Sequence, residues 1–148
     1  MGLFDKILGA KEAEKTTLNK EESFAAIPLA TIAADGNISE EEVLGIVTAL
    51  TRMKLFANYD AKKMNSMFSK LIGVIKRQGV DALVTLSKET LPPELRETVF
   101  AVSADLALAD GILEKAEKDI LTKIQQTLGV PEDVAIKIIE VILIKNKG

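Results

Sequence analysis

Apolar residues recur at helical spacing along most of the chain, and no stretch shows the alternation expected of a half-buried strand. We therefore predict an all-α fold, a single domain of seven or eight helices. The predicted helices cover about residues 3–13, 20–34, 39–54, 60–77, 80–87, 93–109, 114–128 and 131–145. The helix over 20–34 is apolar nearly all round, which predicts a central position, and Pro28 is expected to kink or restart it.

The last predicted helix, over 131–145, is rich in β-branched residues and locally resembles a strand. Its length and the polar stripe of Asp133, Lys137 and Glu140 favour a helix instead. Because apolar residues occupy most of the remaining circumference, we predict that most of this helix is buried.

The start of the chain carries a separate amphipathic segment. Its apolar residues are Leu3, Phe4, Ile7 and Leu8. Charged residues cover the other side of the helix that this spacing predicts. Such a helix either packs on the domain or docks on a partner or a membrane surface. We expect residues 1–15 to form this helix and residues 16–148 to form the helical domain.

An Asp-Gly cassette occurs twice, with its two aspartates 75 positions apart. Residues 34–42 read Ala-Asp-Gly-Asn-Ile-Ser-Glu-Glu-Glu, and residues 109–117 read Ala-Asp-Gly-Ile-Leu-Glu-Lys-Ala-Glu. The order helix, cassette, helix, turn, helix recurs around both, which predicts two pseudo-symmetric halves over about 20–77 and 93–145. If these halves pack about a pseudo-twofold axis, the carboxylates of the two cassettes can face one another.

Each cassette can be explained without a ligand. An Asp before a Gly stabilises a tight turn, and Gly adopts a positive φ angle at little cost. Ser39 and Glu42 form a capping box, and negative charge is favoured in the first turn of a helix. The second cassette fits this explanation less well, because Glu114 is a weak N-cap and Lys115 partly neutralises its surroundings.

The alternative is a shared site for a hard divalent cation, Ca²⁺ or else Mg²⁺ or Mn²⁺. The carboxylates predicted to hold it are Asp35, Glu41, Glu42, Asp110, Glu114 and Glu117. An ordinary EF-hand is excluded, because apolar residues or Thr31 stand where the first half of a calcium loop needs carboxylates. A third interpretation is an acidic patch that docks a basic partner.

Composition narrows the functional classes. A net charge of −3 without a basic cluster argues against nucleic-acid binding. The chain has no Cys and no His, which excludes thiolate and imidazole catalysis and Cys/His zinc sites, so we do not expect an enzyme. No apolar run is long enough to span a bilayer, and the start does not read as a signal peptide. A cytoplasmic protein is therefore expected.

The motifs resemble those of the TerB-like tellurite-resistance family. The similarity is carried by the first cassette, by Met53-Lys54-Leu55-Phe56, and by the second cassette followed by Leu128-Gly129-Val130. It covers about residues 1–130. The resemblance implies an all-helical cytoplasmic domain with two pseudo-symmetric halves, associated with resistance to tellurite and other stresses.

The resemblance also implies divalent cations held by acidic residues. By position these residues are Asp35, Glu41, Glu42, Asp110 and Glu117. Lys115 and Ala116 depart from the fuller acidic pattern. Similar domains serve as interaction modules beside membrane proteins, so we expect a protein partner, which the domain could meet at the inner membrane face. The resulting hypothesis is a non-enzymatic stress-response module that binds cations and recruits a partner; the alternative is an interaction scaffold whose acidic residues only cap helices.

Overall fold

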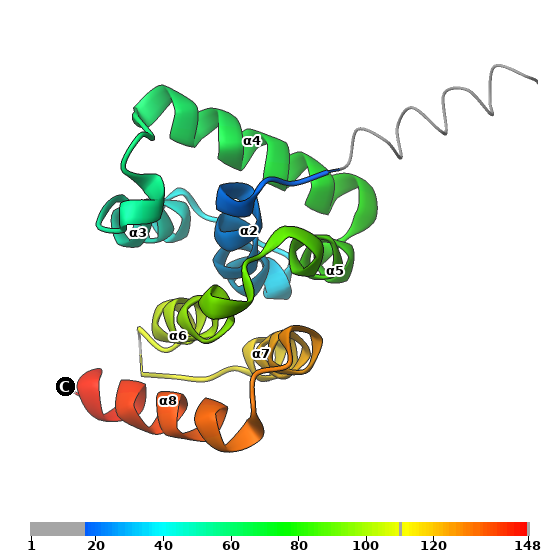
Figure 1. Cartoon of the computed structure of the whole chain (residues 1–148). Coiled ribbons are helices and arrows are strands. Elements are labelled where there is room, and N and C mark those ends of the chain that lie inside the picture. The colour runs from blue at the N-terminus through cyan, green and yellow to red at the C-terminus, as the bar shows by residue number, and fades with distance from the viewer. Residues whose placement is uncertain (1–16, 110, 148) are drawn as a thin grey trace, which may run out of the picture.

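The computed structural model describes residues 17–109 and 111–147, and within them the chain forms helices and no strand (Figure 1). The α-helices are α2 (Lys20–Ile32), α3 (Glu40–Thr51), α4 (Ala61–Gln78), α5 (Val80–Thr90), α6 (Arg96–Ala107), α7 (Lys115–Leu128) and α8 (Glu132–Lys145). Short 3₁₀ helices are η1 (Ala33–Asp35), η2 (Lys54–Phe56) and η3 (Pro93–Leu95). The all-α prediction is confirmed. The helix predicted over 3–13 lies outside the described residues.

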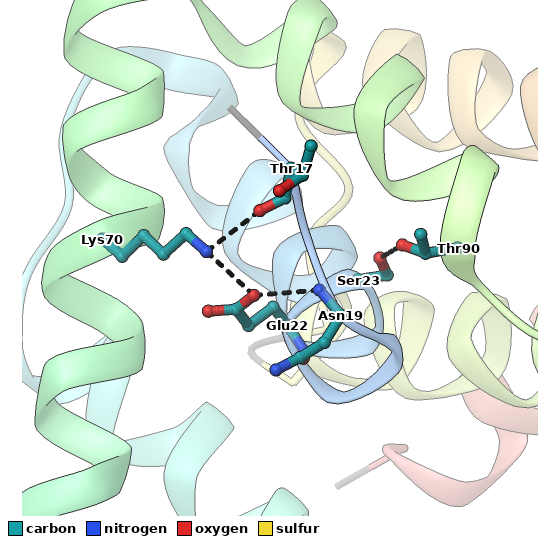
Figure 2. A network of polar contacts seen from close by, with 6 residues as sticks. All are labelled: Thr17, Asn19, Glu22, Ser23, Lys70 and Thr90. Atoms are coloured by element: carbon teal, nitrogen blue, oxygen red, sulfur yellow. Dashed lines mark hydrogen bonds and ion pairs between the residues drawn. The ribbon is translucent and has the colours of Figure 1, made fainter. Parts of the chain in front are cut away.

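Helix α2 occupies the centre, with α3, α4, α5 and α6 around it (Figure 1). Every residue from Ser23 to Ile32 is buried, as the uniformly apolar sequence predicts. The helix does not restart at Pro28, although proline removes one backbone hydrogen bond. The hydroxyl groups of Ser23 and Thr90 form a hydrogen bond, which joins α2 to α5 (Figure 2).

A polar cluster fixes the beginning of α2 against α4 (Figure 2). Asn19 is the N-cap, and its side chain and that of Glu22 exchange hydrogen bonds with each other's backbone N–H groups at 2.8 and 2.9 Å. Lys70 of α4 donates to Glu22 Oε1 and to the carbonyl oxygen of Thr17, both at 3.0 Å. The chain therefore enters the domain at a defined point on α4.

The same order of helices builds both halves. Helix α2 packs on α3 and α4, and α6 packs on α7 and α8. Helices α2 and α6 pack on each other between the halves, while α5 contacts α2, α4 and α7. One continuous set of buried apolar residues runs through both halves. The repeated element order is thus present in the structure, whereas the pseudo-twofold axis stays a prediction.

The predicted burial of helix α8 is wrong. Only Ala135 and Ile142 of this helix are buried, whereas Ile136, Val141 and Ile144 are 50%, 63% and 74% exposed. The reason is its place in the fold: α8 packs on α6 at one edge, and no further helix among the described residues covers its outer side (Figure 1). None of the described helices is both long enough and apolar enough to cross a bilayer.

Candidate functional site

The first cassette begins with a tight turn at the end of α2. Gly36 adopts a φ of 89°, a left-handed conformation that glycine reaches without strain, and its N–H donates to the carbonyl oxygen of Ala33 at 3.0 Å. The Asp35 carboxylate accepts a hydrogen bond from the backbone N–H of Asn37 at 2.9 Å. Because an ionised carboxylate offers about four acceptor positions, this bond still leaves Asp35 the capacity to bind a cation.

The capping box predicted for the start of α3 is present. Ser39 is the N-cap, and its Oγ accepts from the backbone N–H of Glu42 at 3.1 Å. Glu42 Oε1 in turn accepts from Ser39 Oγ at 2.9 Å and from the Ser39 N–H at 3.3 Å. Glu40 and Glu41 lie in the same first turn, and their side chains are exposed. The first cassette therefore presents a dense acidic surface that also stabilises its own helix.

The second cassette repeats this local structure. Gly111 has a φ of 76°, and its N–H donates to the carbonyl oxygen of Leu108 at 3.0 Å, the same turn as in the first cassette. Glu114 is the N-cap of α7, and Glu117 Oε1 accepts from the Glu114 N–H at 3.2 Å. Asp110 lies outside the described residues. The sequence repeat is thus a repeat of turn and helix start as well.

The first cassette lies against a helix of the other half. The η1 turn packs on α7, the helix that begins in the second cassette. The two halves also meet where α3 passes α6, because a Cβ added at Gly45 of α3 would lie 3.7 Å from Leu106 Cδ2 in the last turn of α6. An open hollow of about 390 Å³ lies between the first cassette, the start of α5 and α7, where Asp81, Asp119 and Lys123 line it. The two cassettes therefore belong to one connected region of the fold.

The side chains that the structure describes do not show the predicted convergence of carboxylates. Among them, no three Asp or Glu residues gather closely enough to hold a metal ion together. Glu42 and Glu117 each bind the start of their own helix, which accounts for their orientation. Since Asp110 is one of the predicted ligands, a cation site formed by both cassettes stays a prediction.

An ion pair in the second cassette was not anticipated from the sequence. Lys115 Nζ lies 2.8 Å from Asp119 Oδ2, four residues further along α7. The hydrogen bond to Asp119, together with its negative charge, raises the pKa of Lys115. The spacing of four residues is the signal that could have revealed the pair. Because Lys115 stands where the first cassette has Glu40, the second cassette is the less acidic of the two.

Comparison with known proteins identifies one family. The family model described as "Tellurite resistance protein TerB" matches residues 21–139, a range that contains both cassettes and all the helices from α3 to α7. No curated protein and no solved structure matches the chain.

Proposed function

The chain belongs to the TerB family of tellurite-resistance proteins, and from this premise we propose that it is a non-enzymatic stress-response module that binds divalent cations at its two cassettes and recruits a partner. The observation that supports this proposal is the duplicated helix start. Both cassettes place a left-handed Gly and a capping Glu at the same positions, and the first surrounds them with exposed carboxylates.

The chemistry of these groups fits a hard cation. Carboxylate oxygens suit Ca²⁺, Mg²⁺ and Mn²⁺, and a cation would relieve the repulsion between Asp35, Glu40, Glu41 and Glu42. Two features reduce the affinity: Glu42 is engaged in its helix cap, and the positive end of the α3 dipole opposes a cation. We therefore expect dissociation constants on the order of 10⁻⁴–10⁻³ M, typical of the weaker calcium sites.

The alternative function is a protein-interaction scaffold whose acidic residues only cap helices. The hydrogen bonds of Asp35, Glu42 and Glu117 support this alternative, because each carboxylate already has a structural role. In that case the acidic face docks a basic partner, and ions compete with the partner without being required.

Amide chemical shifts of ¹⁵N-labelled protein titrated with Ca²⁺, Mg²⁺ and Mn²⁺ separate these functions. The cation site predicts saturable shifts confined to residues 34–42 and 109–117, which the double change Asp35→Asn and Asp110→Asn abolishes. Asp60→Asn is the matched control, because Asp60 also caps a helix, through a 2.8 Å bond from the Lys63 N–H, but lies outside both cassettes. Flat or diffuse shifts would favour the scaffold.

Recruitment is tested separately with the N-terminal segment. If this segment docks on a partner or a membrane, deletion of residues 1–13 abolishes the association while the thermal midpoint changes little. Flotation of the full chain and of the deleted chain with vesicles, together with pull-down from a cell extract, measures the association. Unchanged association after the deletion would assign recruitment to the helical domain.

A further inference from the structure

Helix α8 leaves an apolar surface uncovered at one edge of the molecule. Six large hydrophobic side chains are exposed among the described residues, and four of them lie on α8: Ile136, Val141, Leu143 and Ile144. Their exposed fractions range from 45% to 74%. In Figure 1 α8 forms the lower edge of the fold, and both α6 and α7 lie on the same side of it. Apolar surface gathered in this way marks an interaction site.

The corresponding helix of the first half provides an internal comparison. Helix α4 packs on α2 as α8 packs on α6. The exposed residues of α4 are nonetheless small, polar or charged, as Lys63, Asn65, Ser66 and Ser69 show, and none of its large hydrophobic residues is exposed. A helix in this position can therefore have an ordinary solvated outer side, so packing within the monomer does not require the apolar outer side of α8.

Two hollows lie along α8, one beside each of the helices next to it. One, of about 440 Å³, lies between α7 and α8 and is lined in part by Phe100, Leu121 and Ile139. The other, of about 460 Å³, lies between α6 and α8 and is lined in part by Val102 and Ile138. Apolar side chains of a partner can enter hollows of this kind and bury apolar surface there. The surface of α8 thus has the relief that a helical partner needs.

The charges on α8 identify the partner. In chain order they are Glu132, Asp133, Lys137, Glu140 and Lys145, and Lys147 follows directly after the helix. Glu132 and Asp133 stand at the beginning, Lys145 and Lys147 at the end, and Lys137 and Glu140 between them. Two antiparallel copies would therefore place the acidic beginning of each α8 over the basic end of the other. The three acidic and three basic residues cancel, whereas attraction to an anionic membrane needs an excess of Lys and Arg.

We propose that α8 is the interface of a homodimer in which two copies pair antiparallel through this helix. Val141 and Ile144 of each copy enter the groove beside the partner's α8, and Lys137 lies opposite the other copy's Glu140 across the two-fold axis. The proposal does not depend on cation binding, because α8 lies outside both cassettes.

Sedimentation equilibrium of the full chain tests the proposal. We expect a concentration-dependent dimer, and the double change Val141→Glu and Ile144→Glu should raise its dissociation constant at least about tenfold. Leu44→Glu is the matched control, because Leu44 is 64% exposed on α3, away from α8, and its change should leave the dimer intact. A wild-type chain that stays monomeric up to about millimolar concentration, or a dimer that the α8 changes do not weaken, overturns the proposal.

Charge reversal tests the antiparallel arrangement. Asp133→Lys with Glu140→Lys makes α8 predominantly basic, and Lys137→Glu with Lys147→Glu makes α8 and the residues directly after it predominantly acidic. Each variant alone should be monomeric, and an equal mixture should form a heterodimer. Two folded variants that stay monomeric when mixed would contradict the pairing. Flotation with phosphatidylcholine–phosphatidylserine vesicles tests the other occupant. The proposal is overturned, and the surface assigned to lipid, if the wild-type chain is monomeric and floats with the vesicles while the Val141→Glu and Ile144→Glu variant does not.

Discussion

Lys70 Nζ lies 3.0 Å from Glu22 Oε1, which joins the middle of α4 to the first turn of α2. The Glu22 side chain is only 13% exposed, while that of Lys70 is 39% exposed. The same Glu22 oxygen accepts from the backbone N–H of Asn19, so one carboxylate both caps the central helix and holds a neighbouring helix. This arrangement makes the pair a useful probe of the packing between α2 and α4.

We predict that Lys70→Met lowers the free energy of unfolding by about 1 kcal/mol, the upper end of the range for partly exposed ion pairs. The change removes the partner of a largely buried carboxylate and also frees the carbonyl oxygen of Thr17. Urea denaturation followed by far-UV circular dichroism measures the effect. Lys62→Met, at an exposed position of the same helix, should change stability by less than about 0.5 kcal/mol. Equal losses in both variants would contradict a structural role for the pair.

The two cassette caps should differ in strength. Ser39→Ala is expected to cost about 1 kcal/mol, because it removes the hydroxyl that accepts from the Glu42 N–H and donates to its carboxylate. Glu114→Ala should cost less, because glutamate is a weaker N-cap than serine. Chemical denaturation of both variants, without added divalent ions, checks this order. A larger loss for Glu114→Ala would show that the second cassette depends more on its cap than the first.

Tyr59 offers a pH readout, because it is the single tyrosine and the chain has no tryptophan. Burial raises the pKa of Tyr59, and the negative charges of Glu21 and Glu22 raise it further. A raised pKa in the folded state gives stability that is complete below the ordinary value of 10.0 and is lost as the pH rises through the folded value. Absorbance at 295 nm should therefore titrate above pH 10.0 in the folded protein and near it in urea.

Glu21→Gln separates the two causes of this shift. It should lower the Tyr59 midpoint without bringing it to the unfolded value, because burial is the larger cause. A midpoint that falls fully to the unfolded value would show that charge, rather than burial, controls the tyrosine.

The helices and the cassette turns follow from local sequence. Asn19 with Glu22 and Ser39 with Glu42 show the spacing of a capping box, and the structure contains both. The buried length of α2 follows equally from its uniformly apolar composition. These features depend on residues within a few positions of one another, which is why the sequence predicts them.

Features that depend on distant neighbours were not predictable in this way. Periodicity shows that α8 is apolar on most sides but not whether another helix lies beyond it, so its burial was overestimated. Likewise, the spacing of Asp35 and Glu117 along the chain does not determine the distance between their carboxylates in the fold. The contact of Lys70 with Glu22 spans 48 positions and has no local signal.

Two buried serines differ in whether their hydroxyl groups have a hydrogen-bond partner. Ser103 of α6 and Ser87 of α5 are both fully buried. Ser87 Oγ donates to the carbonyl oxygen of Val84 at 2.8 Å, whereas Ser103 Oγ has no hydrogen-bond partner in the part of the chain that the structure describes. A buried hydroxyl without a partner costs about 1–3 kcal/mol, so Ser103→Ala should stabilise the protein by about 1 kcal/mol.

Ser87→Ala should instead be neutral or destabilising, by up to about 1.5 kcal/mol, because it removes a satisfied hydrogen bond. Thermal and urea denaturation of the two variants, compared at the same protein concentration, give the sign of each change. The pair controls for the loss of one buried oxygen atom, so a difference in sign reports the hydrogen bond. If Ser103→Ala destabilises as much as Ser87→Ala, the Ser103 hydroxyl has a partner, such as a bound water or one of the residues outside the described ranges.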